Sequence, residues 1–396
     1  MRLLDCHNFH DFRKLAQKRL PSPIFHYIDG AAEDETTYTR NTASFEKCDL
    51  VPNVLRGVEK LDLSVEVLGQ KLELPIYCSP TALQRVFHYQ GENAVAAAAH
   101  KYKTMFGVSS LGTVSIKEIR EKYEGPQCYQ FYFHKDRQLN QSMLEAAKAA
   151  KIDVMMLTVD TITGGNRERD LRTGFSIPFK LTLNGLFQFA VKPKWALNYL
   201  THDKFSLPQL EEFIDMKGDS VSVGKYFTEM LDPAMTWDDV ARMVEFWDGQ
   251  FCLKGVMSVE DARKAAEIGC TGIVVSNHGG RQLDGSRSPF DQLGEIVDAV
   301  GDRLVGPVGQ EDLEGLVDCS GHDRGGEGGV AHQAAAQLKR LQPNPMPWRF
   351  VVEVEPVTLM ADLRQTAGAS KPLVWLHRQG LLGVRVVGRF QRLAVE

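Results

Sequence analysis

The chain contains 396 residues, of which 43% are hydrophobic and 24% are charged, and its formal net charge is −5. This composition is typical of a globular protein with a large core. Since no basic run of the kind that binds phosphate backbones occurs, nucleic acid is not an expected partner. No apolar stretch is long enough to span a bilayer, and residues 1–20 lack the apolar centre of a signal peptide.

Seven cysteines are scattered along the chain without a CxxC pair or a disulfide-like spacing. This usage favours a reducing compartment, so we expect a cytoplasmic protein without a metal site. The alternative is a secreted protein with free thiols. Residues 1–20 have the leucine and phenylalanine spacing and the basic residues of an amphipathic surface helix.

Six short apolar runs follow one another along the chain, and five of them precede a helical pattern. The runs are 74–80, 104–110, 127–133, 154–160, 251–256 and 272–278. Capping patterns at Ser115/Glu118, Thr236/Asp239 and Ser258/Asp261 mark the starts of three of the expected helices. Strands that alternate with helices indicate a parallel sheet.

Polar groups stand where these expected strands end. They are Ser79 to Thr81, Ser109 and Ser110, Thr158 to Asp160, Lys254, and Ser276 to His278, while Gln130 and Tyr132 share one face of the third run. Each one alone is explained as a polar group satisfied in a loop. Together they are typical of a (β/α)8 TIM barrel, an α/β fold that carries its chemistry at the carboxyl ends of its strands.

The segment 162–235 is too long for a simple connection between a strand and a helix of a barrel. The stretch opens with GGNRERD and has an aromatic middle, LFQFAVKPKWALNYL. We expect an active-site loop that covers the barrel mouth. Membrane contact through the loop 185–205, by Trp195 and the phenylalanines, is the alternative.

The segment SNHGGRQLDG (276–285) brings His278 to the end of a strand, with Arg281 three residues later. An imidazole that takes a proton beside a guanidinium that binds a carboxylate suits chemistry at the α-carbon of a small acid. The alternative is a structural histidine in a turn.

Over about residues 8–304, the chain resembles the FMN-dependent L-2-hydroxy-acid oxidases and dehydrogenases. This family includes glycolate oxidase, lactate oxidase and mandelate dehydrogenase. The motifs that carry the resemblance are FHYIDGAAEDE, SPTA, GVSS, QFYFHKDR, LTVDT with GNRERD, LKGV and SNHGGRQLDG. The resemblance implies an enzyme that oxidises 2-hydroxy acids, lactate-like or bulkier, to 2-oxo acids with FMN, often as a homotetramer. An FMN-dependent isomerase is a second class; the paired arginines and His278 favour the hydroxy acid.

The resemblance also implies a role for individual residues. Residues against the flavin would be Pro80, Thr81, Ala82, Ser109, Gln130, Thr158, Lys254 and Ser276, with Lys254 near its N1–C2=O region. Residues that contact the substrate would be Tyr27, Tyr132, Arg167 and Arg281, with the two arginines on its carboxylate. His278 would be the catalytic base, paired with Asp160. Leu111 stands where glycolate oxidases carry tryptophan, which implies a larger substrate pocket.

The resemblance stops at residues 301–304, so we divide the chain into a barrel (1–304, strands one to six) and an atypical tail (305–396). In the family, strands seven and eight end in Asp-Gly-Gly and Gly-Arg and bind the FMN phosphate, but the tail contains no Asp-Gly-Gly. Residues 349–355 and 381–389 have strand-like patterns, and Gly388-Arg389 resembles the eighth ending. We interpret the tail as a shifted reading frame, with a genuine different module as the alternative. An inactive remnant that lacks FMN is therefore the competing hypothesis.

Overall fold

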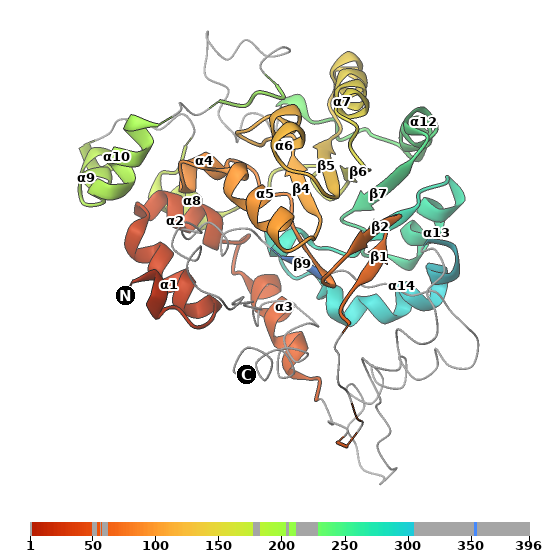
Figure 1. Ribbon diagram of the computed structural model, residues 1–396, viewed down its shortest axis with the longest axis horizontal. Coiled ribbons are helices and arrows are strands. Elements are labelled where there is room, and N and C mark those ends of the chain that lie inside the picture. The colour runs from red at the N-terminus through yellow and green to blue at the C-terminus, as the bar shows by residue number, and fades with distance from the viewer. Residues whose placement is uncertain are drawn as a thin grey trace.

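The computed structural model describes residues 2–49, 54–55, 57, 62–176, 183–202, 206–210, 229–304 and 352–354. Within these residues, a curved parallel sheet forms the centre of the molecule (Figure 1). The strands are β3 (Ile76–Cys78), β4 (Phe106–Ser109), β5 (Gln127–Tyr132), β6 (Val154–Thr158), β7 (Gln250–Lys254), β8 (Gly272–Val274) and β9 (Val352–Val354). Each of the six predicted runs overlaps one of the strands β3 to β8, in chain order, which confirms the predicted strands, although β7 begins one residue before its run.

Helices that follow the strands cover the outer face of the sheet. They are α5 (Glu92–Lys101), α6 (Ile116–Lys122), α7 (Arg137–Ala149), α12 (Trp237–Trp247), α13 (Val259–Glu267) and α14 (Pro289–Leu304). The side chains of Ser115, Thr236 and Ser258 accept hydrogen bonds from the backbone N–H of the third helical residue, as the capping patterns predicted. The alternation of parallel strands and helices defines the fold as a β/α barrel.

The tail contributes one described strand. β9 lies within the strand-like run 349–355 and pairs in parallel with β3, with Val354 opposite Cys78. In a closed eight-stranded barrel, the last strand pairs with the first at this place. Strand seven is not recognisable in the described residues, and the run 381–389 with Gly388-Arg389 lies outside them. The division of the chain at residue 304 stays a prediction.

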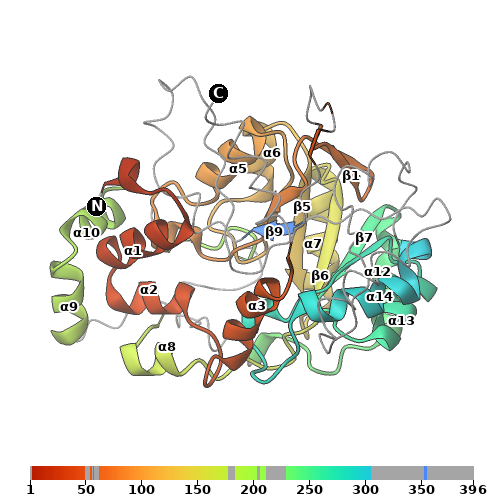
Figure 2. The ribbon, with the colours of Figure 1, turned by 90° about the horizontal axis from the view of Figure 1, so that it is seen from below.

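The N-terminal part packs beside the barrel as three helices, α1 (Phe9–Arg19), α2 (Ser22–Asp29) and α3 (Thr36–Glu46) (Figure 2). α1 is the expected amphipathic helix: Asn8 caps it and Leu15 is buried. A hairpin of β1 (Val65–Val67) and β2 (Gln70–Leu72) follows. The long stretch after β6 contains α8 (Glu168–Thr173), α9 (Leu183–Ala190) and α10 (Pro193–Thr201).

The strand interiors explain where the core lies. All residues of β4, β5 and β6 are buried, as expected for parallel strands covered on both faces. Phe131, Leu157 and Leu253 belong to the large core cluster, whereas Cys128, Met156 and Cys252 pack in a second cluster with Leu72 of the hairpin. Because side chains alternate along a strand, the second cluster occupies the opposite face, inside the barrel.

Candidate active site

The interior face of the barrel changes from apolar to polar towards the carboxyl ends of the strands. On β5, Gln130 follows Cys128, and on β6, Thr158 follows Met156, always two residues further along the same face. Ser109 Oγ donates to Gln130 Oε1 at 2.9 Å, and Gln130 Nε2 donates to Thr158 Oγ1 at 2.9 Å. All three side chains are buried. The structure therefore joins Ser109, Gln130 and Thr158 into one hydrogen-bonded row.

The next two strands add a cation to this row. Lys254, opposite Thr158 on the neighbouring strand, is buried and donates from Nζ to Ser276 Oγ at 3.1 Å. Ser276 Oγ also accepts the backbone N–H of His278 at 3.1 Å. Ser276 thus links the lysine to the loop that carries the histidine.

His278 and Asp160 form a pair that sequence spacing alone could not place. The Nδ1 atom of His278 lies 2.9 Å from Asp160 Oδ1, across 118 residues of chain, and both side chains are largely buried. His278 has φ +58°, a left-handed conformation that is costly for a residue with a side chain and that clusters at functional sites. The second oxygen, Asp160 Oδ2, is buried without a hydrogen-bond partner among the described residues.

Gly255 of the LKGV motif makes room for this pair. It has φ +104°, and a Cβ atom there would lie 2.5 Å from Asp160 Cγ. Only glycine satisfies both the backbone conformation and the close approach. The motif therefore supplies a cation at Lys254 and, one residue later, the space that Asp160 occupies.

Two arginines converge on Tyr27 from different segments. The guanidinium carbon of Arg281 lies 5.2 Å from the centroid of the Tyr27 ring, and that of Arg167 lies 5.4 Å from it. Arg281 Nη1 also donates to the backbone oxygens of Tyr27 and Gly30, at 2.8 and 2.6 Å. Burial, and then the positive charge of Arg281, lower the pKa of Arg167. Two partly buried cations beside the same ring favour binding of an anion.

Tyr132 connects the two halves of the site. Burial, followed by the negative charge of Asp160, raises the pKa of its phenol, while Arg167 and Arg281 act in the opposite direction. The phenol is thus within electrostatic range of the histidine's partner and of both guanidinium groups. The structure brings the predicted substrate residues and the predicted catalytic pair to one place.

Pro80, Thr81 and Ala82 follow β3 at the same end of the barrel. A Cβ atom at Gly107 would lie 2.8 Å from Pro80 Cδ, so the proline ring rests directly on β4. Gln84 Nε2 donates to Thr81 O at 3.1 Å and holds this backbone in place. Leu111 is buried in the core cluster, and its N–H donates to Ser109 Oγ at 3.2 Å. Whether its side chain lines the substrate pocket stays a prediction.

Sequence reasoning missed two acidic residues near the site. Asp170 lies 3.4 Å from Arg167, as Oδ2 to Nε, and burial raises its pKa. The spacing of three residues between Arg167 and Asp170 is a signal that could have revealed this pair. Glu92 is fully buried; its Oε1 accepts the N–H of Thr113 at 2.8 Å and burial raises its pKa. Nothing in its sequence context marks it.

Comparisons with known proteins show which family the chain belongs to. Residues 16–308 match the family model described as FMN-dependent dehydrogenase. The L-lactate dehydrogenase of Vibrio parahaemolyticus is 37% identical over 294 residues, which are 73% of this chain and 76% of that protein. The L-lactate dehydrogenase of Pectobacterium atrosepticum is 37% identical over 297 residues, covering 73% of this chain and 75% of the relative.

Two solved structures share the fold. The structure of (S)-mandelate dehydrogenase, described as a monotopic membrane protein, has a TM-score of 0.71 and 30% identity, and the match covers 75% of this chain and 79% of that one. A mandelate oxidase has a TM-score of 0.63 and 30% identity, over 76% and 77% of the two chains. The chain belongs to the FMN-dependent dehydrogenase family. These matches favour an oxidoreductase over an inactive remnant.

FMN is therefore the cofactor that the site must accommodate, and the residues present fit it. The row of Ser109, Gln130 and Thr158 supplies donors and acceptors above an apolar barrel interior, as an isoalloxazine ring with a polar edge requires. Lys254 adds a buried positive charge at the end of this row. Of the two endings expected to bind the FMN phosphate, Asp-Gly-Gly does not occur in the tail, and Gly388-Arg389 lies outside the described residues.

Proposed function

We propose that this protein oxidises small L-2-hydroxy acids to 2-oxo acids, with His278 as the base. The observation that carries this proposal is the His278–Asp160 pair at 2.9 Å beside the two converging guanidinium groups of Arg167 and Arg281. A carboxylate between the arginines places the hydroxyl-bearing α-carbon near the imidazole, as oxidation of a 2-hydroxy acid requires. Lactate and mandelate, after which the similar proteins are named, are hydroxy acids of this shape.

Each residue of the site has a defined task in this proposal. The Nδ1 atom of His278 faces Asp160, so its Nε2 atom takes the substrate proton, and the Asp160 carboxylate stabilises the imidazolium that forms. Arg167 and Arg281 bind the substrate carboxylate and fix its orientation. Tyr27 and Tyr132 contact the substrate, since both guanidinium groups lie beside the ring of Tyr27 and the charge of Asp160 acts on the phenol of Tyr132.

When bound, FMN supplies a two-electron acceptor for the oxidation. We propose that the residues at the strand ends hold its ring, namely Pro80, Thr81, Ala82, Ser109, Gln130, Thr158, Lys254 and Ser276. The ammonium of Lys254 stabilises negative charge at the nearby edge of the ring, which favours oxidation of the substrate. Buried beside Ser276, this ammonium has little water to screen it.

The experiment that tests the proposal compares the purified full-length protein with His278→Gln. Wild-type protein is expected to lose its visible flavin absorbance when L-lactate or L-mandelate is added without oxygen. The variant is expected to retain FMN, because the proposed flavin contacts remain, and to be reduced more than about 100-fold more slowly, as expected for loss of a general base. Substantial reduction of the variant on the wild-type timescale would exclude His278 as the base.

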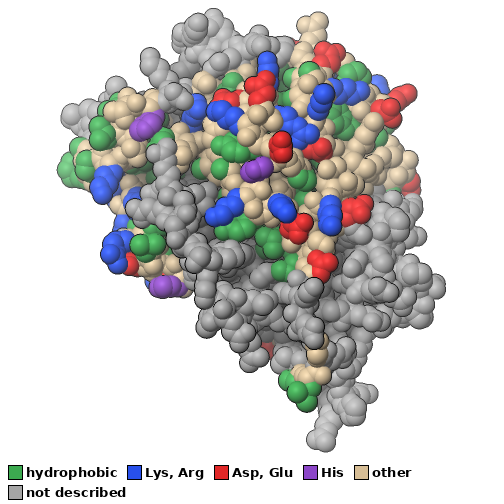
Figure 3. Space-filling view, in the orientation of Figure 1, with side chains coloured by type: hydrophobic (Ala, Val, Ile, Leu, Met, Phe, Trp, Pro, Cys, Tyr) green, Lys and Arg blue, Asp and Glu red, His purple; other side chains and the backbone are tan. Residues whose placement is uncertain are grey.

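A second proposal concerns a membrane surface. On α9, on α10 and between them, four apolar side chains are more than half exposed: Phe187, Val191, Leu197 and Leu200. Hydrophobic and basic side chains gather at the edge of the molecule where these helices lie (Figure 3). Trp195 is not part of this patch, contrary to the sequence-based alternative: it is buried and donates from Nε1 to Val86 O at 2.9 Å. Among the described helices, none is long and apolar enough to cross a bilayer. We propose that α9 and α10 rest on a lipid surface.

Sedimentation with vesicles of anionic phospholipid tests this contact. Phe187→Ser combined with Leu200→Ser is expected to abolish binding, because both side chains are exposed apolar groups on these helices. Leu283→Ser, which changes an exposed leucine outside them, serves as the control. Equal binding by the wild type and the double variant would contradict the contact.

We also propose that the protein is a cytoplasmic homotetramer. In the described part of the chain, six cysteines are outside any disulfide bond, which is consistent with a reducing compartment. Light scattering on the purified protein measures the oligomeric state, and fractionation of cells that express it measures the compartment. A monomer, or a protein found outside the cell, would contradict these two statements.

A further inference from the structure

An ion network joins the N-terminal helices to α8. Arg169 of α8 donates from Nη1 to Asp29 Oδ2 at 2.9 Å and pairs through Nη2 with Glu35. Asp29, at the end of α2, is also bound by Arg13 of α1, whose Nη2 lies 2.7 Å from Asp29 Oδ2. The carboxylates are largely buried, with 8% of the Asp29 side chain and 16% of the Glu35 side chain exposed. Two cations and two anions thus connect four segments.

This network lies next to the backbone that carries the proposed substrate arginine. Arg167 is the residue at which α8 begins, two positions before Arg169. On its other side, the backbone oxygen of Asn166 accepts the N–H of Glu33 at 2.9 Å. The segment 166–169 is therefore fixed twice to the N-terminal segment, once through the backbone and once through Arg169.

The second substrate arginine is fixed to the same segment. Arg281 donates to the backbone oxygens of Tyr27 and Gly30, and the N–H of Ala32 donates to Gly280 O at 2.9 Å. At Gly30 a Cβ atom would lie 2.7 Å from His26 O and 3.2 Å from Arg169 Cδ, so Arg169 packs directly on this backbone. The backbone around Arg167 and the side chain of Arg281 are thus both held by the N-terminal segment.

We propose that Arg169 is a positioning residue: held between Asp29 and Glu35, it fixes Arg167 relative to Arg281 and so sets the affinity for the substrate carboxylate. This inference rests on the proposed function of the site. In the described part of the chain, the group of opposite charge that contacts Arg167 is Asp170, on its own helix. Because that contact moves with α8, it does not fix the helix to the rest of the site. The contacts of Arg169 fix α8 to the N-terminal segment, since they join residues 134 and 140 positions apart.

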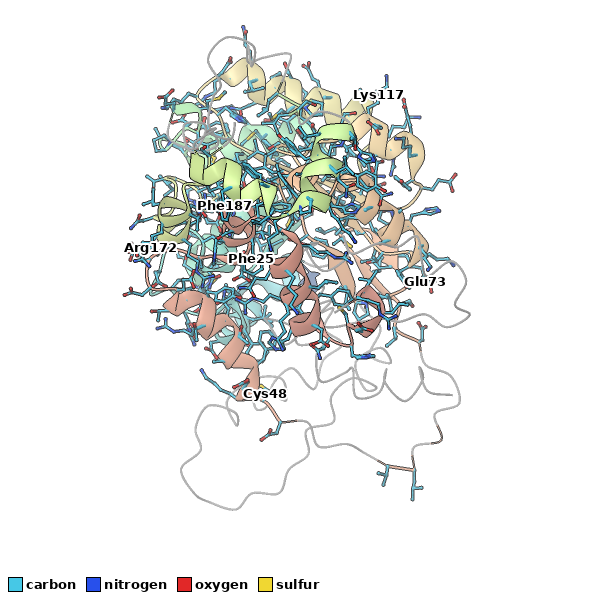
Figure 4. All side chains as sticks on the ribbon, turned by 90° about the vertical axis from the view of Figure 1, so that its left-hand side faces the viewer. Phe25, Cys48, Glu73, Lys117, Arg172 and Phe187 are labelled. Atoms are coloured by element: carbon cyan, nitrogen blue, oxygen red, sulfur yellow. The ribbon has the colours of Figure 1, made fainter. Side chains whose placement is uncertain are left out.

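The test compares Arg169→Met with Arg169→Lys and with a matched control on the same helix. Arg172, at the outer edge of α8 in Figure 4, pairs with Glu168 of the same helix, and its side chain is 76% exposed. In full-length protein, Arg169→Met is expected to raise the KM for the hydroxy acid that reduces the wild type about tenfold, while the limiting rate changes about twofold or less. Arg169→Lys is expected to be intermediate, and Arg172→Met equal to the wild type.

Hydrogen exchange supplies a second readout that does not depend on activity. Backbone amides of residues 167–173 are expected to exchange faster in Arg169→Met, with those of the barrel strands unchanged. An unchanged KM in Arg169→Met, or the same increase in Arg172→Met, would overturn the proposal. If Arg169→Met does not fold, Asp29→Asn and Glu35→Gln take its place, and unchanged KM values in both would overturn it. If no hydroxy acid reduces the wild type, the proposed function fails, while unchanged exchange would separately refute the positioning of α8.

Discussion

Replacing Asp160 by asparagine tests the electrostatic part of the site. The hydrogen bond to His278 spans 2.9 Å between side chains that are 21% and 14% exposed, so solvent screens it little. A hydrogen bond to a charged group contributes about 1.5–3 kcal/mol, and asparagine retains the geometry but loses the charge that stabilises the imidazolium. At about 1.4 kcal/mol for each factor of ten, anaerobic reduction is expected to slow by about 10- to 150-fold in stopped-flow.

Asp153→Asn is the matched control, because Asp153 precedes the same strand at its other end. It pairs with Arg120 at 3.1 Å and accepts the N–H of Gln127 at 2.9 Å, far from the strand ends that form the site. This variant is expected to lose thermal stability and to keep the wild-type reduction rate within about twofold. A rate loss below about threefold in Asp160→Asn, or equal losses in both variants, would refute the role of Asp160.

Three further changes probe different parts of the account. Gly255→Ala places a Cβ atom 2.5 Å from Asp160 Cγ, so both the midpoint of thermal unfolding and the reduction rate are expected to fall; wild-type kinetics would show that the close approach is unimportant. Leu111→Trp is expected to shift the ratio of kcat/KM towards glycolate and away from mandelate, and an unchanged ratio would place Leu111 outside the pocket. Burial lowers the pKa of His134 to about 4, so the unfolded chain binds a proton between pH 6.5 and about 4 that the folded chain does not. Stability against urea is therefore expected to fall by up to about 3 kcal/mol as the pH is lowered through this range, and His134→Asn is expected to lose that dependence.

The barrel strands were predictable because their signal is local. Runs such as 127–133 and 154–160 combine mainly apolar residues with polar residues at the end. The structure places the fully buried strands β5 and β6 within them. His278 was predictable for the same reason, since a strand, a histidine and two glycines follow one another in the sequence. The pairing with Asp160 came from the resemblance, because no local pattern connects positions 118 residues apart.

The remaining features depend on contacts that sequence spacing does not encode. Arg169 meets Asp29 and Glu35 only after the N-terminal helices have packed beside α8. Trp195 of α10 is buried, although Leu197 and Leu200 of the same helix are exposed. It contacts Val86 O of a distant segment, and no pattern within the helix reveals this contact. In the tail, the strand-like run 349–355 was visible in the sequence, but its pairing with β3, in which Val354 lies opposite Cys78, was not.

The central claim is that this chain oxidises L-2-hydroxy acids with FMN at the site that contains His278. Anaerobic titration of the purified full-length protein with L-lactate or L-mandelate, and with the D-enantiomer of each, tests it most directly. We predict that an L-acid bleaches the bound flavin and yields one 2-oxo acid for each flavin reduced, while the D-acids leave the absorbance unchanged. A protein that binds FMN and keeps its flavin absorbance with every L-2-hydroxy acid would contradict the claim.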